Sequence, residues 1–327
     1  MPPARFRPPR GRDLTGVADV VVAGQIARDL VLVVGDVPGP GGSAPVSQRR
    51  EMLGGKGANQ AVALAQLGVA PALVGVVGAD ETGQKLLAQA ERDGIAVAGV
   101  VRRPETRTGL IVDVVDSGGQ WRYLEDLPEP VLLTEADVQA AAGLLPAATW
   151  VSVQLQQPPA AALAAARLGR AAGCRVALDG VPGDPGQRDA LLAGADLVRA
   201  DAHEAELLTG TRLDTPDQAL RAAAALADRG PQLVALAAGR SGNAFAWPGG
   251  QLFLPLTGTP VVDTTGAGDA FTAALIASLL RGDAPEQAAR LAVAAAGATV
   301  GHPGGRPDLT PQALAAQLDL LARQAGG

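Results

Sequence analysis

The chain has 327 residues, of which 47% are hydrophobic but only 2% aromatic, and its formal net charge is −6. This size and apolar content suffice for one large α/β domain or two small ones. The acidic balance and the scarcity of aromatic rings argue against a nucleic-acid partner, which requires a basic surface and stacking side chains. Cys174 is the only cysteine, so intramolecular disulfides and cysteine-built zinc sites are excluded, and a reducing, cytoplasmic setting is expected.

The N-terminal segment, residues 1–17, is basic and rich in proline. It lacks the apolar stretch of a secretion signal, and we expect it to be a disordered tail. The most apolar run that follows is interrupted by Arg28 and Asp29 and is shorter than the roughly 20 residues of a transmembrane helix. The sequence therefore predicts no membrane partner.

From Asp19 onward, short apolar runs alternate with helical patterns. Helix start signals follow Thr134, Thr215 and Thr310, and the apolar spacing after Thr134 predicts a helix that reaches Leu145. Strands alternating with helices predict a three-layer α/β/α fold around a central, mostly parallel sheet. Runs that are nearly continuous in apolar residues predict its buried strands, at residues 19–24, 71–78, 149–155, 174–180, 195–200 and 231–239.

Two stretches, at about residues 28–53 and 95–127, read as strands and turns without helices between them. We interpret them as one small β-sheet, built from two insertions in a single domain that spans residues 18–327. A sheet of this kind over an edge of the domain is suited to act as a lid. Its exposed edge predicts pairing with a second copy of the chain, which gives a homodimer.

Residues 261–275 lead from the end of an apolar run into Gly266, Ala267 and Gly268 and then into a helix with Asp269 in its first turn. Main-chain N–H groups of such a turn can converge on an anion at the helix start. A carboxylate beside an anion hole suits phosphoryl transfer, because it can deprotonate the attacking hydroxyl while the donors hold the moving phosphoryl group. The alternative is an ordinary acidic residue at the start of a helix.

Two further clusters carry polar groups at helix starts. Lys56 and Asn59 stand at the entrance of a helix opened by a glycine run, where they can hold sugar hydroxyls; the alternative is a flexible loop with a solvated lysine. No G-x-x-x-x-G-K-[ST] pattern is present, so this is not a Walker A loop. Asp201 and Glu204 lie three residues apart on one helix face, where they can hold Mg²⁺ directly or through water, or simply decorate the helix start.

Together these clusters resemble the ribokinase-like sugar kinases, the PfkB family, over nearly the whole chain. DTTGAGDAF at residues 263–271 is similar to the family's C-terminal signature, and GGKGANQAVALAQLG at residues 54–68 to its N-terminal one in the form typical of ribokinases. GQIARDL at residues 24–30 and GRSG at residues 239–242 resemble its opening strand-turn and its nucleotide loop. The resemblance implies a ribokinase-like fold, a sugar and ATP as substrates, Mg²⁺, and K⁺ beside the anion hole.

The resemblance also assigns roles to single residues. Asp269 would be the base, and the N–H groups of Gly266, Ala267 and Gly268 would form the anion hole. Glu204 would serve Mg²⁺ through water, and Asp263 and Thr265 would begin the K⁺ site. The acceptor sugar would be held by Asp29, Gly54, Gly55, Lys56, Asn59 and Gln156. The nucleotide would be contacted by Asp201, Gly239, Ser241, Gly242 and Thr265.

The chain departs from the family pattern at several of these positions. Asp201 stands where ribokinases usually carry Asn, and Gln156 where they usually carry Glu. Gln156 keeps an acceptor and gains a donor, which changes the hydroxyls that it can read. Ala237 replaces a threonine of the nucleotide loop, and the lid segment offers Trp121.

The leading hypothesis is an ATP-dependent kinase that phosphorylates a primary hydroxyl of a small sugar, with D-ribose to D-ribose 5-phosphate as the first choice. A kinase of another furanose, of a keto-deoxy sugar acid or of a nucleoside remains open, since Trp121 can line room for a base. Asp201 and Gln156 also leave open a sugar or nucleotide sensor that has lost turnover. An NAD-dependent oxidoreductase is disfavoured because no G-x-G-x-x-G follows the first strand.

Overall fold

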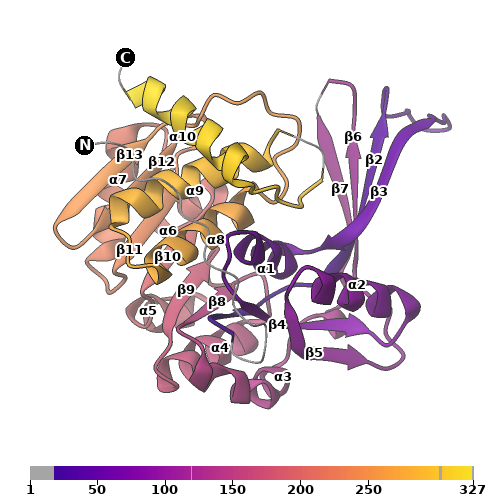
Figure 1. The fold of residues 1–327 in the computed structure, drawn as a ribbon, viewed down its shortest axis with the longest axis horizontal. Helices are drawn as coiled ribbons and strands as arrows, with labels where there is room; N and C mark the ends of the chain where they lie inside the picture. Colours follow the sequence, from indigo (N-terminus) through magenta and orange to yellow (C-terminus); the bar gives the residue numbers. More distant parts are fainter. Residues whose placement is uncertain (1–17, 119, 302–303, 326–327) are drawn as a thin grey trace.

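A long central sheet organises the fold in the computed structural model, which describes residues 18–118, 120–301 and 304–325 (Figure 1). The expected basic tail, residues 1–17, lies outside the described residues. Within them, nine strands form the sheet, and all neighbours from the third strand to the ninth are parallel. In sheet order they are β13 (Gly250–Leu254), β12 (Asn243–Trp247), β11 (Leu233–Ala237), β10 (Leu197–Ala200), β9 (Arg175–Asp179), β8 (Trp150–Gln154), β1 (Val20–Ala23), β4 (Pro71–Gly78) and β5 (Ala96–Arg103).

The apolar runs form buried strands because both faces of the sheet are covered. Along β1, Val20 and Val22 belong to one hydrophobic core, whereas Val21 and Ala23 belong to the other. Successive strand side chains point to opposite faces, so a strand that feeds two cores is apolar throughout. All six predicted strands are confirmed, as β1, β4, β8, β9, β10 and β11.

Ten helices of the described residues form the two outer layers, so the predicted three-layer α/β/α fold is confirmed. The layer on one core contains α1 (Lys56–Gln66), α2 (Glu81–Arg92), α8 (Ala267–Leu280), α9 (Pro285–Thr299) and α10 (Pro311–Ala325). The layer on the other contains α3 (Glu135–Ala140), α4 (Pro159–Ala171), α5 (Pro185–Ala193), α6 (Ala202–Thr209) and α7 (Pro216–Ala227). Short 3₁₀ turns cover Glu129–Val131, Ala142–Ala147 and Gly239–Ser241.

The helix predicted after Thr134 is shorter than expected. Thr134 caps α3 through a capping box with Asp137, but α3 ends at Ala140, and a 3₁₀ turn carries the chain on to Ala147. Pro146 lies inside that turn. A proline ring clashes with the carbonyl four residues earlier, so it does not continue an α-helix. The other two start signals are confirmed, because α7 follows a capping box at Thr215 and α10 begins directly after Thr310.

A separate four-stranded sheet stands beside α1 and α2 (Figure 1). In order, its strands are β3 (Val46–Gly54), β2 (Ala27–Val34), β6 (Leu110–Val115) and β7 (Trp121–Asp126). We call it the lid sheet. The expected second insertion began at residue 95, but Ala96–Arg103 is β5 of the central sheet, so the lid sheet draws only on the later part of that stretch.

The starts of β2 and α1 are held close together at the carboxyl end of β1. A Cβ on Gly57 would lie 2.6 Å from the carbonyl carbon of Gly24, so only glycine permits this approach. The Ala58 N–H group donates to the Gln25 carbonyl oxygen at 3.1 Å. This packing brings the lid sheet and the first turn of α1 to the same edge of the central sheet. None of the described helices is both long enough and apolar enough to cross a membrane.

Candidate active site

Asp269 lies in the first turn of α8, as predicted. Gly266 precedes the helix with φ +71°, and a Cβ there would lie 1.8 Å from the Gly305 carbonyl oxygen, so the turn requires glycine. Asp269 is 5% exposed. Burial and the neighbouring Asp179 carboxylate raise the pKa of Asp269 to about 7. A carboxylate with such a pKa can accept a proton near neutral pH.

The main-chain N–H groups at the start of α8 were expected to form an anion hole. The Ala267 N–H group donates to the Thr264 carbonyl oxygen, at a long distance of 3.3 Å. Within the described part of the chain, neither Gly266 nor Gly268 uses its N–H group in a main-chain hydrogen bond outside the helix. Among the described residues, the Gly266 and Gly268 N–H groups, two of the three expected donors, thus have no competing main-chain carbonyl. All three residues line the same cavity as Asp269.

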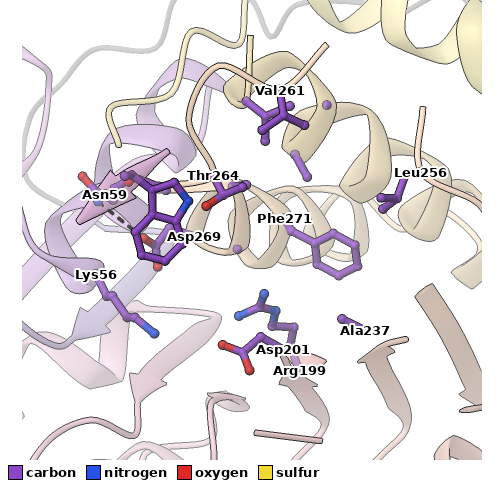
Figure 2. Close-up of a pocket in the computed structure, with 18 of the residues that line it drawn as sticks. Lys56, Asn59, Arg199, Asp201, Ala237, Leu256, Val261, Thr264, Asp269 and Phe271 are labelled. Atoms are coloured by element: carbon purple, nitrogen blue, oxygen red, sulfur yellow. Dashed lines mark hydrogen bonds between the residues drawn. The ribbon is translucent and has the colours of Figure 1, made fainter. Parts of the chain in front are cut away.

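The side chain of Asp269 is oriented by α1. The Asn59 Nδ2 group donates to Asp269 Oδ2 and the Gln60 Nε2 group to Oδ1, each at 3.4 Å; Figure 2 shows the Asn59 contact as a dashed line. Asn59 was predicted at the site, and the structure brings it together with Asp269. Gln60 was not predicted, although it is the next residue along the helix.

Gln60 is completely buried and belongs to a polar network beneath the site. Its Nε2 group also donates to Asp179 Oδ2 at 2.8 Å, and its Oε1 accepts from the Ser152 hydroxyl at 2.8 Å. The Thr272 hydroxyl donates to Asp179 Oδ1 at 3.1 Å. Asp179 closes β9, so a carboxylate at the carboxyl end of an apolar strand was the one signal for it in the sequence.

The expected acceptor residues lie where β2 of the lid sheet meets α1. Asp29 is 5% exposed, and burial together with the Asp269 charge raises its pKa to about 7. A Cβ on Gly54 would lie within 2.2 Å of the carboxyl carbon and both oxygens of Asp29. Gly55 has φ +84° and caps α1. The glycines thus leave room for the Asp29 carboxylate and turn the chain into the helix, while Asp29, Gly55, Lys56 and Asn59 all line the cavity.

Asp201 and Glu204 form a reciprocal capping box at the start of α6. Each side chain accepts a hydrogen bond of 2.8 Å from the other residue's main-chain N–H group. Glu204 Oε1 also lies 3.7 Å from Lys56 Nζ, which links α6 to α1 across the site. Burial and the Asp179 charge raise the pKa of Glu204. These two carboxylates thus cap the helix, which was the predicted alternative, and their positions are also compatible with a role at the site.

Asp263 organises the loop before α8. Its Oδ1 accepts from the Thr265 N–H group at 2.8 Å and from the Thr265 hydroxyl at 2.7 Å, and its Oδ2 accepts from the Gly304 N–H group at 2.8 Å. Both oxygens therefore have protein partners. Thr265 lines the cavity and its hydroxyl contacts the Tyr123 hydroxyl of the lid sheet, a contact that was not predicted.

One cavity of about 610 Å³ gathers most of the predicted residues, between the carboxyl ends of the central strands, the lid sheet and α8. Figure 2 shows Lys56, Arg199 and Asp201 around the end near Asp269, with Ala237, Leu256 and Val261 farther along. Gln156 and Gly239 also line it. The predicted residues that do not line the cavity are Gly54, Glu204, Ser241, Gly242 and Asp263.

Gly242 has a different reason to be glycine. Its φ is +136°, and a Cβ there would lie 2.2 Å from the Leu254 carbonyl oxygen, so it permits β12 to start close against β13.

Arg199 was not predicted at all, yet it lines the cavity beside Gly268. Its signal in the sequence was a charged residue near the end of the short apolar segment Leu197–Ala200, which forms β10.

Comparison with known proteins agrees with this geometry. Residues 17–313 match the pfkB family carbohydrate kinase model. The chain is 30% identical to the ribokinase of Mus musculus, over 79% of this chain and 80% of that protein. It is 33% identical to the ATP-dependent ribose-1-phosphate kinase of Halopiger xanaduensis, over 91% and 97% of the two chains.

A solved structure extends the likeness to the fold. The Arabidopsis thaliana ribokinase, complexed with ribose and ATP, superposes with a TM-score of 0.75 at 28% identity, and the match covers 93% of this chain and 99% of that one. The predicted fold class and the predicted sugar kinase activity are thereby confirmed. The chain belongs to the pfkB family of carbohydrate kinases.

Proposed function

We propose that this kinase transfers the terminal phosphoryl group of ATP to a primary hydroxyl of an unphosphorylated pentose, with D-ribose as the first choice. The observation that carries the proposal is the position of Asp269, buried beside the glycine turn of α8 in a cavity that also contains Asp29, Lys56 and Asn59. The base, the acceptor groups and the main-chain donors thus share one space. The family and the relatives named ribokinase support the same reaction.

The charges that line the cavity favour a neutral acceptor. Among the described lining residues, the cations are Lys56 and Arg199, and both lie at the end near Asp269 (Figure 2). The acceptor end is lined by the carboxylates of Asp29 and Glu125 and by the amide of Gln156. A sugar that already carries a phosphate would place it among these groups without a cation. We therefore favour a free sugar over a ribose 1-phosphate.

ATP and Mg²⁺ fit the other end of the cavity. Apolar side chains there, including Leu256, Val293 and Val300, suit an adenine ring. Among the described residues, no group of three or more His, Cys, Asp or Glu side chains could hold a metal. Magnesium that arrives with ATP keeps several waters and requires only one or two protein carboxylates, a demand that Glu204 would meet through water. The metal would neutralise charge on the phosphates.

In the proposed step, the acceptor hydroxyl oxygen attacks the terminal phosphorus atom. Its proton passes to Asp269, the bond between phosphorus and the bridging oxygen breaks, and ADP leaves with the electron pair. Lys56, which the sequence assigned to the acceptor sugar, is here proposed to hold the charge on the phosphoryl oxygens instead, together with the N–H groups of Gly266 and Gly268. Closure of the lid sheet over the acceptor would exclude water and suppress ATP hydrolysis.

A nucleoside kinase is the second candidate. Trp121 and Tyr123 on β7 both line the cavity, and their ring centroids lie 4.6 Å apart. An aromatic pair at the lid could pack against a base attached to the sugar. A sensor without turnover is less well supported, because Asp269 and the glycine turn are both retained.

A panel of acceptors tests these alternatives. Purified protein would be assayed for ADP release with ribose, 2-deoxyribose, other furanoses, ribose 1-phosphate and nucleosides. We expect ribose to give the highest kcat/KM and ribose 1-phosphate to give less than a tenth of it. Asp269→Asn should abolish turnover while calorimetry still detects sugar binding; unchanged turnover would reject Asp269 as the base.

Two further features belong to the proposal. K⁺ would bind near Asp263 and Thr265, with main-chain carbonyls as its remaining ligands, and activity in K⁺ and Na⁺ buffers tests this.

The lid sheet would pair with a second copy through an edge strand, β3 or β7; Leu124 on β7 is 66% exposed. Light scattering would distinguish a dimer from a monomer.

A further inference from the structure

Arg199 is a cation built into the phosphoryl end of the cavity. It lies near the carboxyl end of β10, and its side chain is only 12% exposed. A Cβ on Gly268 would lie 2.5 Å from Arg199 Nη2 and 2.8 Å from Nη1. The guanidinium group therefore packs directly against the main chain of the helix start that precedes Asp269, and Figure 2 shows it there.

One edge of this guanidinium group is held firmly by carboxylates. Arg199 Nη1 donates to Asp179 Oδ1 at 3.1 Å and lies 3.9 Å from Glu204 Oε2. Burial would lower the pKa of Arg199, but the charges of Asp179, Glu204 and Asp201 outweigh burial and raise that pKa. The group is thus charged and oriented before any ligand arrives.

A purely structural role does not account for this arrangement. Asp179 already accepts hydrogen bonds from Gln60 and Thr272, so its carboxylate has partners without an arginine. An ion-pair partner for Asp179 also has no need to line the cavity, as Arg199 does. The planar fork of an arginine is well suited to phosphate oxygens, and one edge of it lies beside the expected anion hole.

The position of Asp201 gives Arg199 a second task. Asp201 also lines the cavity, and a carboxylate at the phosphoryl end repels ATP. Arg199 lies two residues earlier, and its charge interacts with that of Asp201. A fixed cation there offsets this repulsion without any change in the capping box of α6.

We propose that Arg199 is a catalytic residue of the kinase reaction, an inference that rests on the proposed function. Its guanidinium group donates to an oxygen of the terminal phosphoryl group while that group passes from ADP to the acceptor oxygen. Arg199 keeps its proton throughout, since the acceptor proton goes to Asp269. Arginine side chains that stabilise the transition-state charge in GTPases accelerate phosphoryl transfer about 10³- to 10⁵-fold.

The first experiment compares Arg199→Gln with the matched control Arg175→Gln. Arg175 lies on the adjacent strand β9, stacks on Trp150 at 4.3 Å and pairs with Asp196 at 4.0 Å, but it does not line the cavity. We expect Arg199→Gln to lower kcat about 100-fold or more, with the KM for the acceptor changed less than about threefold, and Arg199→Lys to fall between. Arg175→Gln should retain wild-type kcat. Equal kcat in wild type and Arg199→Gln, per folded molecule by circular dichroism, overturns the inference.

The second experiment reads the contact without turnover. Calorimetry would measure the affinity of wild type and Arg199→Gln for ADP and for a non-hydrolysable ATP analogue with an imido bridge. We expect the variant to lose at least tenfold in affinity for the analogue and less than threefold for ADP. Equal losses of affinity for both nucleotides would mean that Arg199 has only a structural role. This result stands even if no acceptor of the panel is phosphorylated, an outcome that would reject only the proposed function.

The double variant Arg199→Gln/Asp201→Asn tests the charge balance. Asparagine is as good a helix cap as aspartate, so α6 should keep its start. We expect the double variant to recover at least tenfold of the kcat lost in Arg199→Gln, because no unbalanced carboxylate then faces the phosphates. If the double variant recovers no kcat, Arg199 does not act by offsetting the charge of Asp201.

Discussion

Gln60 joins two carboxylates that would otherwise repel one another. Its Nε2 group donates to Asp179 at 2.8 Å and to Asp269 at 3.4 Å, so each of its two amide protons serves a different acid. All three side chains are buried. The proximity of Asp179 destabilises the charged form of Asp269, while the amide of Gln60 stabilises it. The proton affinity of the expected base is therefore set in part by Asp179 and Gln60, which do not line the cavity.

The first prediction concerns the pH dependence of turnover. Burial and Asp179 raise the pKa of Asp269 to about 7, and only the deprotonated form can accept the acceptor proton. We expect kcat/KM to be highest above that pKa and to fall at least tenfold per pH unit as the pH drops below it, because the pKa of Asp29 is also raised to about 7. Initial rates between pH 5 and pH 9 measure this. A profile that is flat down to pH 5 would contradict the assignment.

The second prediction follows from the Gln60 network. Gln60→Leu removes the hydrogen bond that favours ionised Asp269, so the acidic limb of the pH profile should move to higher pH. The Asp179 oxygen and the Ser152 hydroxyl also lose a partner, which should cost roughly 1–3 kcal/mol of unfolding free energy. Chemical denaturation and the pH profile of the same preparation separate the two effects.

Gln66→Leu is the matched control on the same helix. Gln66 donates to the Pro307 carbonyl oxygen at 2.8 Å and accepts from the Leu309 N–H group at 2.9 Å, so its loss also removes two hydrogen bonds. It does not line the cavity. We expect it to lower stability without moving the acidic limb. A shift in both variants would mean that the limb reports folding instead of Asp269.

The network explains which part of the site the sequence could predict. Asp269, Lys56 and Asn59 stand at helix starts next to glycines, and such signals are local. Gln60 and Asp179 are 119 residues apart and meet only because α1 packs against the carboxyl end of β9. The order of strands within a sheet cannot be inferred from any single segment of the sequence. The contact between Gln60 and Asp179 was therefore not predictable from local patterns.

Two local signals were overlooked, and one strand was assigned to the wrong sheet. Arg199 interrupts an apolar run, and a charge in a buried strand already indicates a partner or a ligand. Pro146 indicated that the segment after Thr134 does not continue as a regular α-helix through Leu145, and α3 indeed ends at Ala140. The strand Ala96–Arg103 was assigned to the lid because strands follow it, yet it pairs with β4 in the central sheet. Pairing partners, unlike strand formation, depend on the whole fold.

The third prediction concerns the choice of sugar. Gln156 lines the cavity and is exposed to it, so its amide can donate to one hydroxyl and accept from another. Glutamate can only accept, and it is the residue usual in ribokinases. We expect Gln156→Glu to raise the kcat/KM for ribose relative to other sugars by about threefold or more. An unaltered ranking of the acceptor panel would remove Gln156 from the specificity argument.

The fourth prediction concerns the space that Gly54 leaves for Asp29. In Gly54→Ala the new methyl group would lie about where the Asp29 carboxylate is now, within 2.2 Å of both its oxygens, so that side chain must rotate away. We expect kcat/KM for the acceptor to fall about 100-fold, with little change in the KM for ATP. Gly35→Ala is the matched control, because Gly35 lies just beyond β2 and a Cβ there meets nothing within 4 Å. The contrary outcome is that Gly54→Ala retains wild-type kcat/KM while Asp29→Asn loses it. In that case the Asp29 carboxylate has room that the packing at Gly54 does not reveal. The glycine would then be required only for the turn into α1.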